Sequence, residues 1–391
     1  MTDMEQQKLS AKNILTLVAL SCAAFVFNTS EFVPIGLLSD IAADFGRTEA
    51  QAGMLISSYA WVVMLLSLPL AMAFSRMRMR QLLLAVMSVF TLFQGLSYIS
   101  GTYAMLLVSR MGVACAHALF WAIILPIAVQ SVPPKFADLA MSVVVTGTSI
   151  AVIMGMPLGR TVGLMAGWRA AFLCLGLFSL ATLVFVALTL PPTPAGGGVS
   201  LKNLPKMLSN RTLLCIYTLT FLFVVGYYTA YSYVEPYLKQ VGAMPETLIT
   251  IALMVFGCAG LLGSVLFSKI YSRNRRRFIT VTIAGLVLTL ALLLPCSGSH
   301  PLLMALCALW GFSVTAYNLA LQRELLATVS ADESAVAMSI YSGIFNFGIS
   351  TGAVAGGAIC THLSLSLLGP LSAIAAAAAL VFWLAALRRR V

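Results

Sequence analysis

Long apolar runs recur along the whole chain and are separated by short polar segments. A run of about 18 or more residues can cross the roughly 30 Å hydrocarbon layer of a bilayer as an α-helix. The runs predict twelve membrane-spanning helices, near residues 13–38, 51–73, 81–100, 103–127, 138–162, 168–190, 211–236, 246–270, 278–295, 301–322, 334–359 and 363–387. A membrane β-barrel would instead show short segments that alternate apolar and polar side chains. The pattern therefore predicts an all-α integral membrane protein.

The longest polar stretch divides these helices into two sets of six. It begins with Pro-Pro-Thr-Pro at residue 191, continues with three glycines, and includes Lys202 and Lys206. Proline, glycine and charge in this order are typical of a linker. We expect a six-helix bundle over residues 1–190, a cytoplasmic linker over 191–210, and a second six-helix bundle over 211–391.

An internal repeat supports this division. The segment Ser75-Arg-Met-Arg-Met-Arg80 recurs as Ser272-Arg-Asn-Arg-Arg-Arg277, at an offset of 197 residues. At the same offset, Gly155 and Gly159 correspond to Gly352 and Gly356. Two matches at one offset predict two bundles related by pseudo-symmetry, as in secondary transporters that bind their solute at the repeat interface.

Glycines four residues apart let membrane helices approach closely. Such ladders include Gly155 and Gly159 in the predicted fifth helix, and Gly352 and Gly356 in the eleventh. Close packing alone would explain them. Pro157 also weakens the backbone hydrogen-bond ladder of the fifth helix, so we expect these five residues to act in packing and gating.

The basic residues indicate the orientation in the membrane. Of the 391 residues, 60% are hydrophobic and only 9% are charged, yet the net charge is +11. If the N-terminus is cytoplasmic, 18 cations lie in the tails and even-numbered loops, whereas four (Arg47, Arg160, Arg169 and Lys239) lie in odd-numbered loops or their margins. Because cytoplasmic loops are rich in Lys and Arg, we place both termini in the cytoplasm. The same distribution argues against nucleic acid as a partner.

Glu31 is a candidate for proton exchange. A charge at bilayer depth is costly and normally faces a cavity or a partner, and an apolar setting favours the neutral form of a carboxylic acid. Glu31 shares a helix face with Asn28, one turn earlier. The alternative is an interfacial carboxylate, because Asp40 and the outer loop follow closely.

His117 is a second candidate, since histidine titrates near neutrality. Arg110, seven residues earlier, falls on the same helix face, and Trp121 lies one turn further on. An arginine there disfavours a charged histidine and favours a charged Glu31, so that a proton on one group could be exchanged against the other. A histidine that merely hydrogen-bonds between helices, and an arginine that binds carbonyl oxygens, are the alternatives.

Uncharged polar and aromatic residues within the apolar runs suggest the solute. They are Asn28, Tyr227, Tyr228, Tyr231, Tyr233, Tyr317, Asn318, Gln322 and Asn346. Amides bind hydroxyl groups, aromatic faces cover sugar rings, and no cluster of charges calls for an ionic solute. We expect Asn28, Trp121, Tyr231, Asn318 and Asn346 to bind a small molecule, although each tyrosine taken alone also fits a packing or interfacial role.

The chain shows no sign of an enzyme or an ATP-driven pump. It has no Gly-rich phosphate loop followed by Lys-Ser/Thr, and its eight cysteines are scattered without metal-ligand spacing. We therefore expect no catalytic residues, no metal and no cofactor, with protons as the coupling ion. A membrane enzyme or a sensor is the competing class.

Three segments resemble the drug:proton antiporter branch of the major facilitator superfamily, whose two-bundle plan the whole chain resembles. They are Asn28-Thr-Ser-Glu-Phe-Val-Pro-Ile-Gly-Leu-Leu-Ser-Asp-Ile-Ala42, Arg110-Met-Gly-Val-Ala-Cys-Ala-His-Ala-Leu-Phe-Trp121 and Gly155-Met-Pro-Leu-Gly-Arg160. Within that branch the chain is most similar to bacterial sugar-efflux transporters of the SotB type. The resemblance implies proton-coupled export of sugars or sugar-like solutes, sometimes also drugs, by a monomer in the lipid of the bacterial inner membrane.

Two departures weaken parts of the resemblance. The branch normally has Gly, an acidic residue, Arg and Gly between its second and third helices, where this chain has Ala71, Ser75, Arg76 and Arg78. An acidic contact there is not expected. The direction of transport is implied by the resemblance alone, so a proton-driven sugar importer stays as an alternative. A multidrug or nucleoside proton antiporter is the other alternative.

Overall fold

The protein is an all-helical membrane protein, as predicted. The computed structural model describes residues 9–74, 76–192 and 209–388, and every regular element in these ranges is a helix. Among the described residues, eleven helices have the length and hydropathy to cross a membrane. Their main segments are α2 (Ala11–Gly36), α5 (Met54–Ala73), α6 (Met79–Tyr98), α7 (Tyr103–Gln130), α8 (Ala137–Ile150) continuing through η2 (Ala151–Gly155) into α9 (Met156–Ala166), α10 (Trp168–Thr189), α12 (Arg211–Tyr231), α14 (Glu246–Ile270), α16 (His300–Thr328), α17 (Ala331–His362) and α18 (Leu368–Arg388).

The twelfth predicted helix, near 278–295, forms as α15 (Arg275–Leu292). Its 18 residues start with three arginines, so only the remainder is apolar. Side chains that carry hydrogen-bond acceptors begin several helices: Asn210 caps α12, Thr102 caps α7, and Asn274 caps α15. These caps satisfy backbone N–H groups that have no partner inside the helix.

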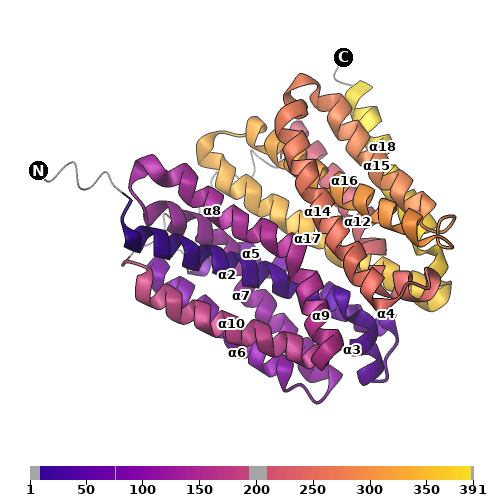
Figure 1. Ribbon diagram of the computed structural model, residues 1–391. Helices are drawn as coiled ribbons and strands as arrows, with labels where there is room; N and C mark the ends of the chain where they lie inside the picture. The colour runs from indigo at the N-terminus through magenta and orange to yellow at the C-terminus, as the bar shows by residue number, and fades with distance from the viewer. Residues whose placement is uncertain (1–8, 75, 193–208, 389–391) are drawn as a thin grey trace, which may run out of the picture. The chain divides into compact units, whose positions relative to one another are not determined.

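Contacts divide the described residues into two compact units. One contains residues 9–33 and 65–192, and the other contains 34–64 and 209–388. Figure 1 shows α2, α6, α7, α8 and α10 of the first unit as long helices, and α12 and α14–α18 of the second. Most of the predicted linker, residues 193–208, lies outside the described residues, so the division into bundles at 191–210 stays a prediction.

Residues 34–64 pack with helices from the second half of the chain. This segment includes α3 (Leu38–Asp44) and α4 (Glu49–Ala52). The backbone N–H of Ser39 donates to the buried carboxylate of Glu235 at 3.1 Å. A Cβ at Gly53 would lie 2.1 Å from the hydroxyl oxygen of Tyr233, so this close approach requires glycine.

Helix α12 is shorter than the predicted helix over 211–236, which is therefore wrong at its end. It stops at Tyr231 and is followed by the short α13 (Val234–Pro236) and a π-helical turn, η3 (Tyr237–Val241). Pro236 has no N–H with which to continue the helix back to residue 232. Tyr233 at the break donates its hydroxyl to the carbonyl of Ala353 at 3.0 Å.

Both glycine ladders pack against the first long helix of their own unit. A Cβ at Gly155 would lie 2.5 Å from the Thr29 side chain, and one at Gly159 would lie 2.3 Å from the Val33 side chain, both in α2. In the second unit, a Cβ at Gly352 would lie 2.8 Å from the carbonyl of Val225, and one at Gly356 would lie 2.3 Å from that of Thr229, both in α12. The predicted packing role is therefore visible at all four glycines, and their role in gating stays a prediction.

The π-helical turn η2 ends two residues before Pro157. Proline interrupts the regular hydrogen bonding and clashes with the carbonyl four residues back, and a wider π turn relieves this conflict. Arg160, which the sequence places near an outer loop, lies inside α9 with its side chain fully buried.

Candidate functional site

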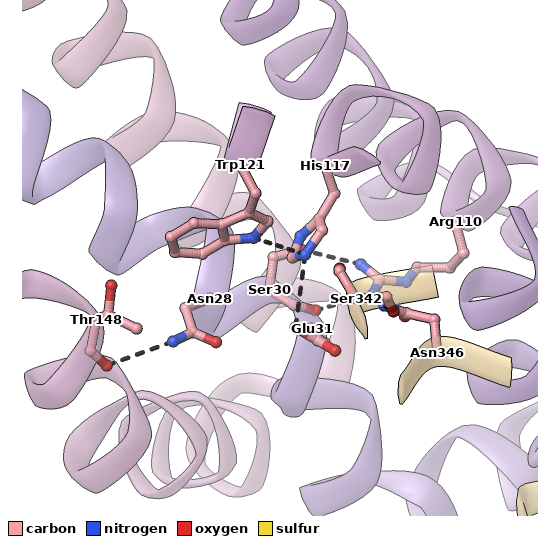
Figure 2. Close-up of polar contacts among 9 residues, drawn as sticks. All are labelled: Asn28, Ser30, Glu31, Arg110, His117, Trp121, Thr148, Ser342 and Asn346. Atoms are coloured by element: carbon pink, nitrogen blue, oxygen red, sulfur yellow. Dashed lines mark hydrogen bonds and ion pairs between the residues drawn. The ribbon is translucent and has the colours of Figure 1, made fainter. Parts of the chain in front are cut away.

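Arg110 holds α2 through both oxygens of Ser30. Its guanidinium donates from Nη1 to the Ser30 hydroxyl at 3.0 Å and from Nη2 to the Ser30 carbonyl at 2.8 Å, as Figure 2 shows. Only 1% of Arg110 is exposed, and its guanidinium carbon lies 5.7 Å from the centre of the Phe172 ring. The planar fork of arginine suits this double acceptor.

Pro34 explains why the Ser30 carbonyl needs an outside donor. Within α2, the N–H of residue 34 would normally bind the carbonyl of residue 30, but proline has no N–H. In a membrane, a freed backbone group has to be satisfied by a neighbouring helix or side chain. Arg110 of α7 supplies this donor, so the arginine secures the proline-interrupted part of α2 beside Glu31.

His117 lies between an indole and a carboxylate. Trp121 Nε1 donates to His117 Nε2 at 2.8 Å, and Glu31 Oε2 lies 3.7 Å from the same nitrogen. The Glu31 separation is longer than a hydrogen bond. Side-chain exposure is 6% for His117 and 21% for Glu31, so the pair is largely shielded from water.

The indole contact determines the state of the histidine. An indole N–H can only donate, so Nε2 of His117 accepts and carries no proton in this arrangement. A proton could bind Nε2 only if the Trp121 N–H moved away, because both use the same lone pair. The proton on Nε2 would then lie beside the Glu31 carboxylate, whose Oε2 is 3.7 Å from this nitrogen. Trp121 and a proton thus compete for one atom.

Aromatic rings from three helices line one side of this group. Phe27 of α2 stacks on Phe90 of α6 and on Phe120 of α7, with ring centres 3.9 Å apart in both pairs. All three rings are fully buried. Asn28, the next residue, donates from Nδ2 to the Thr148 carbonyl of α8 at 3.4 Å. The Phe27 ring lies 6.4 Å from the His117 ring, so part of the surroundings of His117 is apolar.

In the second unit, Asn318 is the centre of a polar cluster. Its Oδ1 accepts from the Tyr341 hydroxyl at 2.8 Å and from Gln322 Nε2 at 3.1 Å. Asn346 lies on α17, one helical turn and one residue beyond Tyr341, and donates from Nδ2 to the Ser342 carbonyl at 3.0 Å. The Asn318 cluster therefore links α16 with α17 through Tyr341, whereas the bond of Asn346 stays within its own helix.

Tyr231 belongs to a buried aromatic cluster of the second unit. Its ring stacks on Phe256 with centres 5.0 Å apart and lies 5.8 Å from Trp310. Tyr227 and Tyr228 also pack against it. Tyr317 donates its hydroxyl to the Leu219 carbonyl at 3.1 Å, so this tyrosine, like Tyr233, serves to join helices.

Sequence reasoning did not identify Ser30 and Gln94 as parts of the site. Gln94 of α6 is fully buried and hydrogen-bonds the Ser30 hydroxyl through Nε2. The available signals were a glutamine within an apolar run and a proline four residues after a serine. Neither says which helix supplies the partner, because that depends on the packing of α2, α6 and α7.

Comparison with known proteins identifies the fold family. The sequence model described as Major Facilitator Superfamily matches residues 20–323. Crystal structures of a bacterial homolog of the human lysosomal transporter Spinster are similar over 97% of this chain, at 16% identity. The inward-facing, occupied form has a TM-score of 0.78 over 98% of that chain, and the inward-facing, unoccupied form has 0.74 over 96%. The human organic anion transporter MFSD10 (TETRAN) matches over 96% of this chain and 100% of that chain, with a TM-score of 0.68 and 13% identity.

Proposed function

The chain belongs to the Major Facilitator Superfamily, and from this premise we propose that it is a proton-coupled antiporter that exports sugars or sugar-like solutes. The observation that carries the coupling is the partly buried Trp121–His117–Glu31 group, in which two titratable side chains lie 3.7 Å apart. Titratable residues inside membrane helices typically mark proton pathways. Export and the sugar class rest on the resemblance to the drug:proton antiporter branch and its SotB-type members.

The proposed topology has twelve spans with both termini in the cytoplasm of a bacterium. We include α15 as the twelfth span, because the 18-residue stretch from Phe278 to Pro295 carries no charged side chain after the arginines. The predicted linker at 191–210 would join two six-helix bundles related by pseudo-symmetry. The protein would act as a monomer in the inner membrane.

Coupling would work by exchange of partners at His117. When a proton binds Nε2, the imidazolium loses its bond from Trp121 and gains attraction to the Glu31 carboxylate. Glu31 lies one turn before Pro34, the first residue of α2 that is assigned to the second unit. A change of charge at Glu31 thus acts on the segment of α2 that a conformational change of the transporter would have to move.

The polar cluster on α16 and α17 supports an uncharged, hydroxylated solute. Asn318, Tyr341 and Asn346 offer amide and hydroxyl groups, and the Phe345 ring lies 6.3 Å from that of Tyr341. These groups match the needs of a sugar, which presents both hydroxyls and an apolar ring face. Asn28 and Trp121 are the corresponding candidates on the first unit.

Accumulation of a labelled pentose in cells that overproduce the chain tests the proposal. We expect lower accumulation than in cells with an empty vector, and a protonophore should remove the difference, because export then lacks its driving force. Raised accumulation that the protonophore abolishes would show uptake and contradict the direction. If the pentose is unaffected but a nucleoside or a cationic dye is excluded, the sugar assignment is wrong and the antiport assignment is retained.

Replacement Trp121→Phe tests the competition for Nε2. Phenylalanine keeps an aromatic ring but cannot donate, so a proton meets less competition at His117. We expect the pH of half-maximal transport to rise by about 0.5 to 1 unit, the equivalent of one hydrogen bond. A pH profile of transport in proteoliposomes measures this. Trp383→Phe, which also removes an indole donor, is the control and should leave the profile in place; equal shifts in both variants would refute the role of Trp121.

A further inference from the structure

The second unit contains a cavity of about 450 Å³ that none of the proposed transport residues line. Its walls come from α12, α15, α16 and α18 and from the segment that joins α14 to α15. The volume lies within the range of about 300–1,000 Å³ that is usual for small-molecule sites. The cavity is therefore large enough to hold a ligand of its own.

One side of the cavity is strongly basic. Arg273, Arg275 and Arg276 line it, and the only carboxylate of its lining is Glu324. Glu324 is already engaged, because it accepts from the Tyr271 hydroxyl and lies 3.7 Å from Arg275. Within the described residues neither Arg273 nor Arg276 forms an ion pair. The side chains of Arg273 and Arg276 could therefore bind an anionic ligand.

The other side is apolar. Its lining residues are Ile216, Leu219, Ile279, Leu321 and Phe382. Ile216, Leu219, Ile279 and Leu321 are buried. A small inorganic anion would satisfy the arginines but would leave this apolar surface against water. The lining suits a molecule that has an anionic head and a hydrocarbon part.

The depth of the cavity in the membrane favours a lipid. Arg273 ends the span Glu246–Arg273, so the basic side lies at a membrane–water boundary. Trp383, also in the lining, donates from Nε1 to Thr280 at 2.9 Å, and tryptophan is typical of the headgroup region. Basic pockets between membrane helices bind anionic lipid headgroups.

We propose that this cavity binds an anionic phospholipid, with the headgroup phosphate at Arg273 and Arg276 and an acyl chain against the apolar lining. The site lies within the second unit and does not depend on the solute or on the coupling ion. Its occupation would also offset the mutual repulsion of the three arginines at the start of α15, where cations are unfavourable next to the positive end of the helix dipole.

Lipid titration of the purified full chain tests the site. Phosphatidylglycerol, phosphatidylcholine with the same acyl chains, and inorganic phosphate are added separately in detergent, and binding is followed by native mass spectrometry and thermal unfolding. We expect phosphatidylglycerol to bind and stabilise the protein. The double variant Arg273→Gln/Arg276→Gln should bind it about 30-fold more weakly, given the usual attraction of each basic residue to anionic lipid.

The repeat in the first half of the chain offers a matched control. Arg76→Gln/Arg78→Gln removes the same charge from two exposed arginines of the corresponding loop, which do not line the cavity, and should leave binding in place. Cys215→Trp fills the cavity without altering its charge and should also weaken binding; it provides the test if the arginine variant does not fold. The proposal is overturned if both arginine pairs have equal effects, if phosphatidylcholine binds equally well, or if inorganic phosphate alone reproduces the stabilisation.

Discussion

The variant Glu31→Gln is expected to lose proton-driven transport completely while it still binds the solute. Glutamine keeps the size and hydrogen-bonding capacity of the side chain but cannot take up or release a proton. In the proposed mechanism, the charge that attracts protonated His117 would be missing in every state. Uphill transport in proteoliposomes with an imposed proton gradient should therefore fall to the level of empty vesicles.

Solute counterflow without a gradient separates coupling from structure. Counterflow needs only binding and conformational exchange, so we expect Glu31→Gln to keep it within about twofold of the wild type, the usual range for a substitution without structural effect. Asp138→Asn neutralises an exposed carboxylate in the first turn of α8 and should leave both assays unchanged. Equal loss of gradient-driven transport and counterflow in Glu31→Gln would assign Glu31 a structural role.

The variant Arg110→Lys is expected to destabilise the protein and to impair transport. Lysine keeps the charge, but its ammonium cannot present the planar fork that reaches both the hydroxyl and the carbonyl of Ser30. Loss of one charge-assisted hydrogen bond at a buried site costs about 1.5 to 3 kcal/mol. The temperature of half-unfolding in detergent should fall, and the transport rate should fall with it.

Pro34→Ala provides the partner for a double-mutant cycle. Alanine at residue 34 has an N–H that can bind the Ser30 carbonyl within α2, so this carbonyl would no longer depend on Arg110. We expect Arg110→Lys to cost less stability in the Pro34→Ala background than in the wild type, a coupling that the cycle measures directly. Additive effects of the two substitutions would contradict the account of Arg110 given by the structure.

The sequence misplaced the end of one predicted helix, and this error has a physical cause. The predicted helix over 211–236 ignored the effect of Pro236, because apolar and aromatic residues continue through the break after Tyr231. The hydroxyls of Tyr233 and Tyr317 bind backbone carbonyls of neighbouring helices, which fits the packing role that was left open for each single tyrosine.

Other features could be read directly from the chain. The length and hydropathy of the runs predict membrane helices, because only a helix can satisfy its backbone groups in lipid without a partner. The match of Arg110 and His117 to one helix face follows from helical periodicity alone, and the structure places both on α7 with buried side chains. Glycine ladders predict close packing because a missing Cβ is a local property.

The sequence by itself therefore predicted the class of the protein, most of its helices and the small set of ionisable residues within the apolar runs. Only the tertiary structure decided which atoms meet: Arg110 with both oxygens of Ser30, Trp121 with His117 Nε2, and Glu31 at 3.7 Å from that nitrogen. Periodicity gives the face of a helix, whereas its rotation and depth against a neighbour depend on side-chain packing between distant segments. Contacts of this kind cannot be predicted before the packing of α2 against α7 is known.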